Sequence, residues 1–207
     1  MIGHNGCGKT TLFKSLTGKI AYSGQILVNG ADLRTHPNPA AAGMLSYLPQ
    51  KAAVTFSIPV RELVVMGRFR QKKFFENYQT EDYEAAEKTL DRLQIAHLAS
   101  RDFTELSGGE QQLVWLAQLM LQDAALCLLD EPTQHLDIYH KKKVFSLIQD
   151  WVQQDGKTVI CITHDISNLS RMEGFLLNLS KPSPALEPIT PATLAENQQF
   201  LEEGYFN

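Results

Sequence analysis

The chain has 207 residues, 43% of them hydrophobic, and a formal net charge of −4 at pH 7. This length and hydrophobic content fit a single globular domain, and the slightly acidic balance argues against a basic surface that binds nucleic acid. No apolar run is long enough to span a bilayer, and the three cysteines lack metal-ligand spacing.

A phosphate-binding loop is the first element that the sequence predicts. The pattern G-x-x-x-x-G-K-[ST] is matched by Gly3, His4, Asn5, Gly6, Cys7, Gly8, Lys9 and Thr10. The glycines let backbone N–H groups approach an anion, Lys9 can reach the β- and γ-phosphates of a nucleotide, and the Thr10 hydroxyl can ligate Mg²⁺. The alternative is a chance glycine-rich turn. However, the apolar spacing of residues 10–16 predicts the helix that must follow such a loop, with Gly18 as its C-terminal cap.

Short apolar runs alternate with helical stretches along the rest of the chain, which predicts an α/β fold with a largely parallel sheet. The predicted strands are residues 23–30, closed by an Asn-Gly turn, and residues 44–48, 125–129, 157–163 and 175–179. Between residues 58 and 122 the pattern is mostly helical, and Thr80 is expected to cap one of these helices. Because this segment separates two predicted strands, we expect a helical lobe inserted into an α/β core.

The apolar run from Leu126 to Leu129 ends in two acidic residues, Asp130 and Glu131. The carboxyl end of a buried parallel strand lies at the ligand-binding edge of the sheet. We therefore expect Asp130 to hold Mg²⁺ and Glu131 to polarise an attacking water. The alternative is an acid pair in an ordinary strand-to-loop turn, and the phosphate-binding loop in the same chain argues against it.

Ser107, Gly108 and Gly109 precede an apolar helix. Ser107 and Glu110 fit a capping box, which is the purely structural interpretation. A capping box does not require two consecutive glycines, since each Gly costs about 1 kcal/mol relative to Ala inside a helix. We therefore expect another surface to approach this backbone closely, and the N–H groups of the first helical turn predict a second anion site.

Together these motifs resemble those of the nucleotide-binding subunit of an ATP-binding cassette (ABC) transporter. In chain order, the matching segments are the Walker A loop (Gly3 to Thr10), the Q-loop glutamine (Gln50), the signature motif (Leu106 to Glu110), Walker B (Leu126 to Glu131), the D-loop (Pro132 to Asp137) and the switch histidine (His164). The resemblance covers nearly the whole chain. It implies a P-loop NTPase fold of the RecA-like type, with a core of residues 1–57 and 123–207 and a helical subdomain of residues 58–122.

The resemblance also implies roles for the site residues. Glu131, His164 and Gln50 would be catalytic, and Thr10, Gln50 and Asp130 would hold Mg²⁺. ATP would be bound by Gly3, His4, Asn5, Gly6, Cys7, Gly8, Lys9, Thr10 and Thr11 of one copy and by Ser107, Gly108 and Gly109 of another. The implied partners are a second ATP-binding subunit in a homodimer, transmembrane permease subunits and, indirectly, an extracytoplasmic solute-binding protein. The implied location is peripheral, at the cytoplasmic face of the cell membrane.

Three segments resemble one group within the family, the importers of iron–siderophore complexes, haem and cobalamin. They are residues 59–68, Trp115 and residues 136–138. We therefore expect a ferric-siderophore-type importer ATPase. Two alternatives remain: a non-transport ABC ATPase, which would predict a coiled-coil insertion or a second cassette, and a truncated chain that is catalytically weak or folds incompletely.

The sequence departs from the family pattern at several positions. Leu113 and Gln118 stand where arginines are common, Gln134 and His135 replace a pair of small residues, and Cys7 replaces a common serine. Family members also carry strands and an adenine-stacking aromatic residue ahead of the loop, where this sequence has two residues. On that basis we expect those strands and the aromatic residue to be absent, and stability and nucleotide binding to be reduced.

Overall fold

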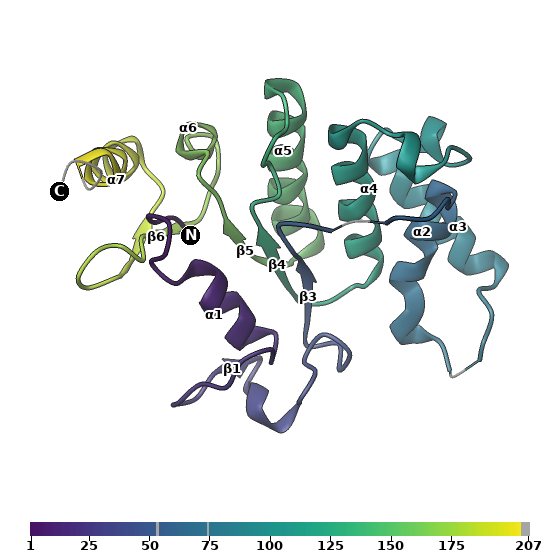
Figure 1. The fold of residues 1–207 in the computed structure, drawn as a ribbon, viewed down its shortest axis with the longest axis horizontal. Coiled ribbons are helices and arrows are strands. Elements are labelled where there is room, and N and C mark those ends of the chain that lie inside the picture. Colours follow the sequence, from purple (N-terminus) through teal and green to yellow (C-terminus); the bar gives the residue numbers. More distant parts are fainter. Residues whose placement is uncertain (53, 74, 204–207) are drawn as a thin grey trace.

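A three-stranded parallel sheet forms the centre of the molecule (Figure 1). The computed structural model describes residues 1–52, 54–73 and 75–203. The strands of the sheet are β3 (Leu45–Leu48), β4 (Leu126–Asp130) and β5 (Thr158–Ile162), in the spatial order β3-β4-β5. They confirm the predicted α/β fold and three of the predicted strands, each to within one residue at either end.

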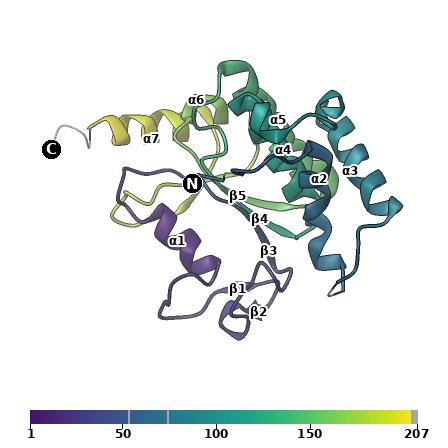
Figure 2. The same ribbon diagram turned by 45° about the vertical axis from the view of Figure 1, so that its right-hand side comes forward.

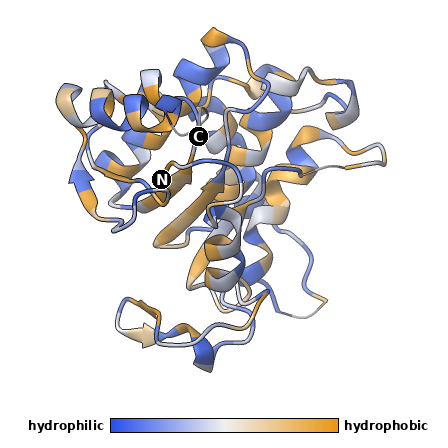
Figure 3. Cartoon of the chain, turned by 60° about the vertical axis from the view of Figure 1, so that its left-hand side comes forward, coloured by the Kyte–Doolittle hydropathy of each residue, from blue (hydrophilic) through white to orange (hydrophobic). Residues whose placement is uncertain are grey.

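Helices cover both faces of this sheet. They are α1 (Lys9–Leu16) on one face and α4 (Gly108–Leu121) and α5 (Ile138–Asp155) on the other, as Figure 2 shows. Side chains alternate along a strand, so Leu128 of β4 packs in the cluster of α1, whereas Leu129 packs in the cluster of α4 and α5. Burial on both faces explains the uninterrupted apolar sequence of β4. Figure 3 shows the hydrophobic residues concentrated on the strands between the helices.

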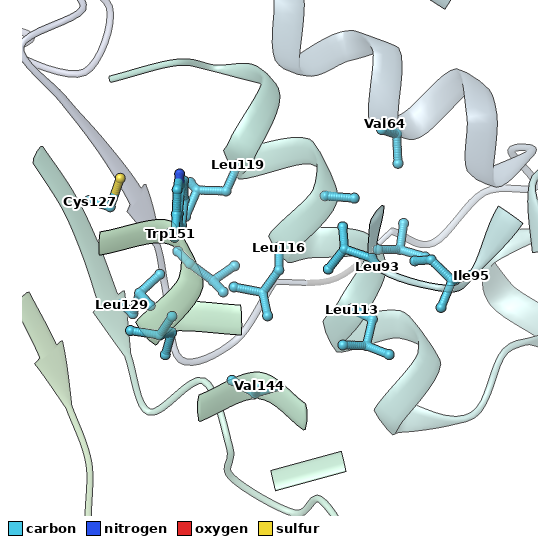
Figure 4. Packing of buried hydrophobic residues seen from close by; sticks show 14 of the residues in the cluster. Val64, Leu93, Ile95, Leu113, Leu116, Leu119, Cys127, Leu129, Val144 and Trp151 are labelled. Carbon is cyan, nitrogen blue, oxygen red and sulfur yellow. The ribbon is translucent and has the colours of Figure 1, made fainter. Parts of the chain in front are cut away.

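The larger hydrophobic cluster joins α4 to α5 and the sheet (Figure 4). Leu116 and Leu119 of α4 lie in this cluster with Leu129 of β4 and with Val144 and Trp151 of α5, all of them buried. This shared core attaches α4 to the sheet.

Several helices lie between β3 and β4 in the chain and gather at one side of the sheet (Figure 1). They are α2 (Val60–Val65), the 3-10 helices η2 (Met66–Gln71), η3 (Ala96–Leu98) and η4 (Phe103–Glu105), α3 (Thr80–Arg92) and α4. We call this group the helical lobe. The expectation that Thr80 caps a helix was wrong, because the N-cap of α3 is Gln79. The Asp82 carboxylate accepts a hydrogen bond from the Gln79 N–H at 2.8 Å, which makes Thr80 the first helical residue.

The residues that lead into the phosphate-binding loop lie between β5 of the central sheet and a second, two-stranded antiparallel sheet. The strands of this second sheet are β6 (Phe175–Leu177) and β7 (Leu186–Pro188). The Ile2 N–H donates to the Leu177 carbonyl at 2.9 Å, and the Thr163 N–H donates to the Met1 carbonyl at 3.1 Å. Ile2 is 1% exposed. The loop therefore starts from a buried residue that is hydrogen-bonded to a neighbouring strand.

The remaining elements are β1 (Leu27–Val28), β2 (Ala31–Asp32), η1 (Leu33–Thr35), α6 (Ile166–Leu169) and α7 (Pro191–Glu203). The strand predicted over residues 23–30 is reduced to β1, which pairs with β2. The turn between them is the predicted one, since Asn29 and Gly30 have φ angles of 50° and 80°. None of the helices in the described residues is long and apolar enough to cross a membrane.

Candidate nucleotide-binding site

The phosphate-binding loop has an open side and a closed side. Gly3, Gly6 and Gly8 have φ angles of 148°, 83° and 102°, which residues with a side chain rarely adopt. A Cβ at Gly3 would lie 2.5 Å from the Cys7 Sγ, so the loop is closed there. A Cβ at Gly6 or Gly8 would meet no heavy atom within 4 Å beyond the neighbouring residues. The loop thus leaves room for a ligand beside Gly6 and Gly8.

Lys9 and the first turn of α1 give this loop a positive charge. Lys9 is 7% exposed, and its Nζ donates to the carbonyls of Gly3 at 2.7 Å and His4 at 2.9 Å. The N-cap of α1 is Gly8, which has no side chain to bond the N–H groups of the first helical turn. Thr10 and Thr11 of that turn are exposed, as is Asn5 in the loop. A helix N-terminus beside a lysine is suited to binding phosphate.

Asp130 lies at the carboxyl end of β4 and is buried, with 3% exposure. Burial raises the pKa of its carboxyl above the ordinary value, and the negative charge of Glu131 raises it further. A hydrogen bond from the Tyr47 hydroxyl at 3.4 Å and the charge of Lys9 oppose this rise in pKa. Lys9 of the loop is therefore among the charges that act on this carboxyl.

The acid pair fits a site for Mg²⁺ that is completed by a ligand. A bound cation would neutralise the unfavourable charge of Asp130. No group of three or more His, Cys, Asp or Glu side chains that could hold a metal occurs among the described residues. Mg²⁺ is typically held by one or two carboxylates together with water and substrate phosphates, so the Asp130 carboxylate could serve as one of its ligands.

Two predicted residues, Gln50 and His164, converge on Glu131. The Gln50 Nε2 donates to the Glu131 Oε2 at 3.1 Å, and the His164 Nε2 lies 3.1 Å from the Glu131 Oε1. Glu131 has a φ angle of 53°, an uncommon value for a residue with a side chain. Gln134 also accepts a hydrogen bond from Gln50 at 3.0 Å. In the sequence, Gln134 is visible only as a departure from the family pattern, and its contact with Gln50 was missed.

The role of the residue after His164 was not predicted from the sequence. The Asp165 carboxylate accepts hydrogen bonds from the Thr133 hydroxyl at 2.5 Å and from the Lys141 Nζ at 2.7 Å. These bonds tie the turn that carries His164 to the segment that follows Glu131. An acidic residue next to His164 is the only signal that the sequence contained.

The signature segment lies apart from this cluster. The Glu110 N–H donates to the Ser107 hydroxyl at 3.4 Å, and the Glu110 carboxylate accepts from the Ser107 N–H at 2.8 Å, which confirms the capping box. A Cβ on Gly109 would lie 2.6 Å from the His140 ring, so another surface does approach the backbone here. A Cβ on Gly108 would meet nothing within 4 Å. Ser107 is the N-cap of α4, and α4 lies on the face of the sheet opposite α1 (Figure 2).

A cavity of about 320 Å³ lies beside the start of the loop. Its lining includes Gly3 and His4 of the loop, His164 and residues of α7. The His4 Nε2 lies 2.9 Å from the Leu201 carbonyl oxygen, and the His4 ring stacks on the Phe200 ring. This contact joins the loop to α7.

The chain is similar to a family of known proteins. The sequence model of the family described as ABC transporter matches residues 1–134. The chain belongs to the ABC transporter family. The achromobactin transport ATP-binding protein of Dickeya dadantii is 36% identical to it over 168 residues, which cover 81% of this chain and 62% of that protein. The iron(3+)-hydroxamate import ATP-binding protein of Bacillus subtilis is 31% identical over 209 residues, which cover 98% of this chain and 78% of that protein.

Solved ABC structures share the fold. One is the inward-facing conformation of an ABC transporter described as metal-chelate type, with a TM-score of 0.74 and 30% identity over 91% of this chain and 71% of the other. An ATP-binding cassette in its ADP conformation has a TM-score of 0.81, covering 100% of this chain and 86% of the other. At 22% identity, that second likeness concerns the fold alone. The chain spans 62% of the length of the Dickeya relative.

Proposed function

We propose that the chain is the ATP-binding subunit of an ABC importer, which hydrolyses ATP to drive the uptake of an iron–siderophore complex or a related metal chelate through a membrane permease. The observation that carries the proposal is the convergence of Gln50 and His164 on Glu131, beside Asp130 and near Lys9. The names of the two relatives, which refer to achromobactin and iron(3+)-hydroxamate, support the choice of cargo class.

In the proposed reaction, the loop and Lys9 bind the β- and γ-phosphates of ATP. Lys9 would exchange its bonds to the Gly3 and His4 carbonyls for bonds to phosphate oxygens. Glu131 orients the attacking water and accepts its proton, and the bonds from Gln50 and His164 hold that carboxylate in place. Thr10, Gln50 and Asp130 would hold Mg²⁺, which when bound neutralises phosphate charge.

A second copy of the chain would complete each site. Ser107, Gly108 and Gly109 form the start of α4, and α4 lies on the face of the sheet away from α1 (Figure 2), so these residues suit the nucleotide of a partner. The homodimer would associate with transmembrane permease subunits at the cytoplasmic face of the membrane. A solute-binding protein on the other side would deliver the chelate to the permease.

The first test measures ATP hydrolysis by the purified chain. Wild type is expected to hydrolyse ATP, and Glu131→Gln is expected to lower kcat by about 100-fold or more, since a positioned general base contributes about 100- to 10,000-fold. The substitution keeps the shape of the side chain, so nucleotide binding should persist. Hydrolysis that is unchanged in Glu131→Gln would contradict the assigned mechanism.

The second test concerns transport. The chain is co-expressed with permease subunits of a ferric-siderophore importer and reconstituted in vesicles that contain ATP, and uptake of labelled ferric siderophore is measured. ATP-dependent uptake that is lost in Glu131→Gln supports the importer. If ATP is hydrolysed but the permease neither binds the chain nor changes its rate, the protein is a non-transport ABC ATPase.

A further inference from the structure

The helices α4 and α5 meet at their first turns through Gly109 and His140. A Cβ on Gly109 would lie 2.6 Å from Cγ, 2.7 Å from Cδ2 and 2.8 Å from Nδ1 of the His140 ring. Nonbonded Cβ contacts this short do not occur in proteins, so the ring occupies the space of the missing side chain. A side chain at position 109 would therefore displace the His140 ring or the start of one of the two helices.

The His140 ring is itself held in one orientation. Asp137, the N-cap of α5, accepts the His140 N–H through Oδ1 at 2.9 Å, and its Oδ2 lies 2.8 Å from the ring Nδ1. The Tyr139 ring meets the His140 ring edge-on, with centroids 5.3 Å apart. The imidazole is 21% exposed. These contacts give the ring a fixed position at the start of α5.

Two further contacts at the start of α4 come from within the helical lobe. Ser107 and Glu110 bond each other, and the Gln111 Nε2 donates to the Phe103 carbonyl at 3.1 Å. His140 lies on α5, which packs on the sheet. The contact of His140 with Gly109 therefore joins the lobe to the sheet within two residues of Ser107, while Gly108 keeps an open side.

We propose that His140 is a positioning residue, whose ring sets the start of α4 against α5 so that Ser107 and Gly108 are presented to the nucleotide of a second copy. This inference rests on the proposed function. His140 would act through Gly109 and touch no part of the nucleotide. Its loss should therefore lower kcat while leaving the KM for ATP nearly unchanged, because the loop and Lys9 are unaltered.

The experiment compares four variants of the full chain: Gly109→Ala, His140→Ala, the double variant Gly109→Ala/His140→Ala, and Gly108→Ala. Gly109→Ala should lower both the unfolding temperature and kcat, the latter by about tenfold or more, because the added methyl overlaps the ring. Removing the ring in the double variant should restore kcat to the level of His140→Ala, a coupling that independent residues do not show. Gly108→Ala is the control for folding and should unfold at the wild-type temperature.

Two results would overturn the proposal. One is a double variant that is no more active than Gly109→Ala, and the other is a His140→Ala variant with wild-type kcat. Unfolding temperatures can be measured without ATP. They therefore test whether His140 packs on Gly109 even if the chain does not hydrolyse ATP. A wild-type chain that binds no ATP would instead contradict the proposed function.

Discussion

Cys7 offers a chemical test of the loop at the level of one side chain. Its Sγ lies 3.9 Å from the Lys9 Nζ, at the closed side of the loop. Burial raises the pKa of Cys127, and it raises the pKa of Cys161 to about 12, so neither thiol readily forms the reactive thiolate. We expect iodoacetamide to label Cys7 first and to abolish ATP hydrolysis, and we expect ATP to protect against both. Mass spectrometry of the labelled chain and its residual activity provide the measurements.

The matched control is Cys7→Ser, which keeps a small polar side chain in the loop. This variant should hydrolyse ATP and should keep its activity after the same treatment. Full activity of the wild-type chain after complete labelling of Cys7 would show that ATP hydrolysis does not depend on the loop that carries this thiol.

The raised pKa of Asp130 predicts that the chain becomes less stable as the pH rises, whereas most acidic residues in folded proteins have the opposite effect. Because its folded pKa is raised above 3.8, the folded chain keeps a proton that the unfolded chain has already lost, and stability falls as pH rises through that window. Asp130→Asn has no such proton to lose. It should therefore unfold at a higher temperature than wild type near pH 7, while losing ATP hydrolysis. Thermal unfolding from about pH 4 to about pH 8 measures the difference.

Asp137 provides a control, because its pKa is shifted in the opposite direction to that of Asp130. Hydrogen bonds from the backbone and ring of His140 lower the pKa of Asp137, so its contribution to stability is present above 3.8 and is lost as pH falls through the folded pKa. Asp137→Asn should therefore lower the unfolding temperature at neutral pH. An Asp130→Asn variant less stable than wild type at neutral pH would show that burial does not destabilise the charged form of Asp130.

Sequence order predicted the residues of the site better than it predicted their partners. Glu131, Gln50 and His164 could be named because each belongs to a motif, and the structure brings them together. The bond of Gln134 to Gln50 and the contact of His140 with Gly109 could not be named. Both depend on side chains that are distant in the chain and that meet only once the sheet has formed.

At the level of elements, α5 connects the sheet to the helical lobe through Trp151. This side chain is 4% exposed and lies in the cluster that contains Leu116, Leu119 and Leu129. Trp151→Ala should destabilise the chain by about 3–5 kcal/mol, through lost burial and the cavity that remains. A domain of this size loses about 2–4 °C of unfolding temperature per kcal/mol, so the drop should be about 10 °C. Thermal unfolding by circular dichroism measures it.

The next residue on the same helix, Val152, is the control for this prediction. It is 38% exposed, so Val152→Ala should change the free energy of unfolding by less than about 0.5 kcal/mol. Equal losses in Trp151→Ala and Val152→Ala would show that the cluster between α4 and α5 does not contribute as described.

The buried strands were the elements that the sequence predicted best. All residues of β4 are buried, and a short uninterrupted apolar run is typical of a strand that is covered on both faces. The strand expected over residues 23–30 was predicted too long, because β1 pairs only with β2, as a two-residue hairpin strand. The start of α3 was misplaced by one residue because Gln79, a residue rarely expected at an N-cap, receives support from Asp82.

At the level of the whole molecule, the proposed dimer depends on where the loop and Ser107 lie in the fold. The loop precedes α1 on one face of the sheet, and Ser107 precedes α4 on the other (Figure 2). In the proposed two-fold dimer, each site takes its loop from one chain and its signature segment from the other. Removal of Lys9 and removal of Ser107 therefore damage different parts of each site.

This arrangement predicts that two inactive variants restore each other. Lys9→Ala and Ser107→Ala should each lose nearly all hydrolysis alone, whereas a mixed dimer keeps one intact site, with Lys9 from one chain and Ser107 from the other. An equal mixture should recover up to about a quarter of wild-type activity, since about half of the dimers are mixed and each has one intact site of two. Unfolding temperatures control for the lost cap at Ser107, which is worth about 1 kcal/mol. If both variants fold and exchange partners but the mixture hydrolyses no faster than the separate chains, the two residues do not meet at one nucleotide.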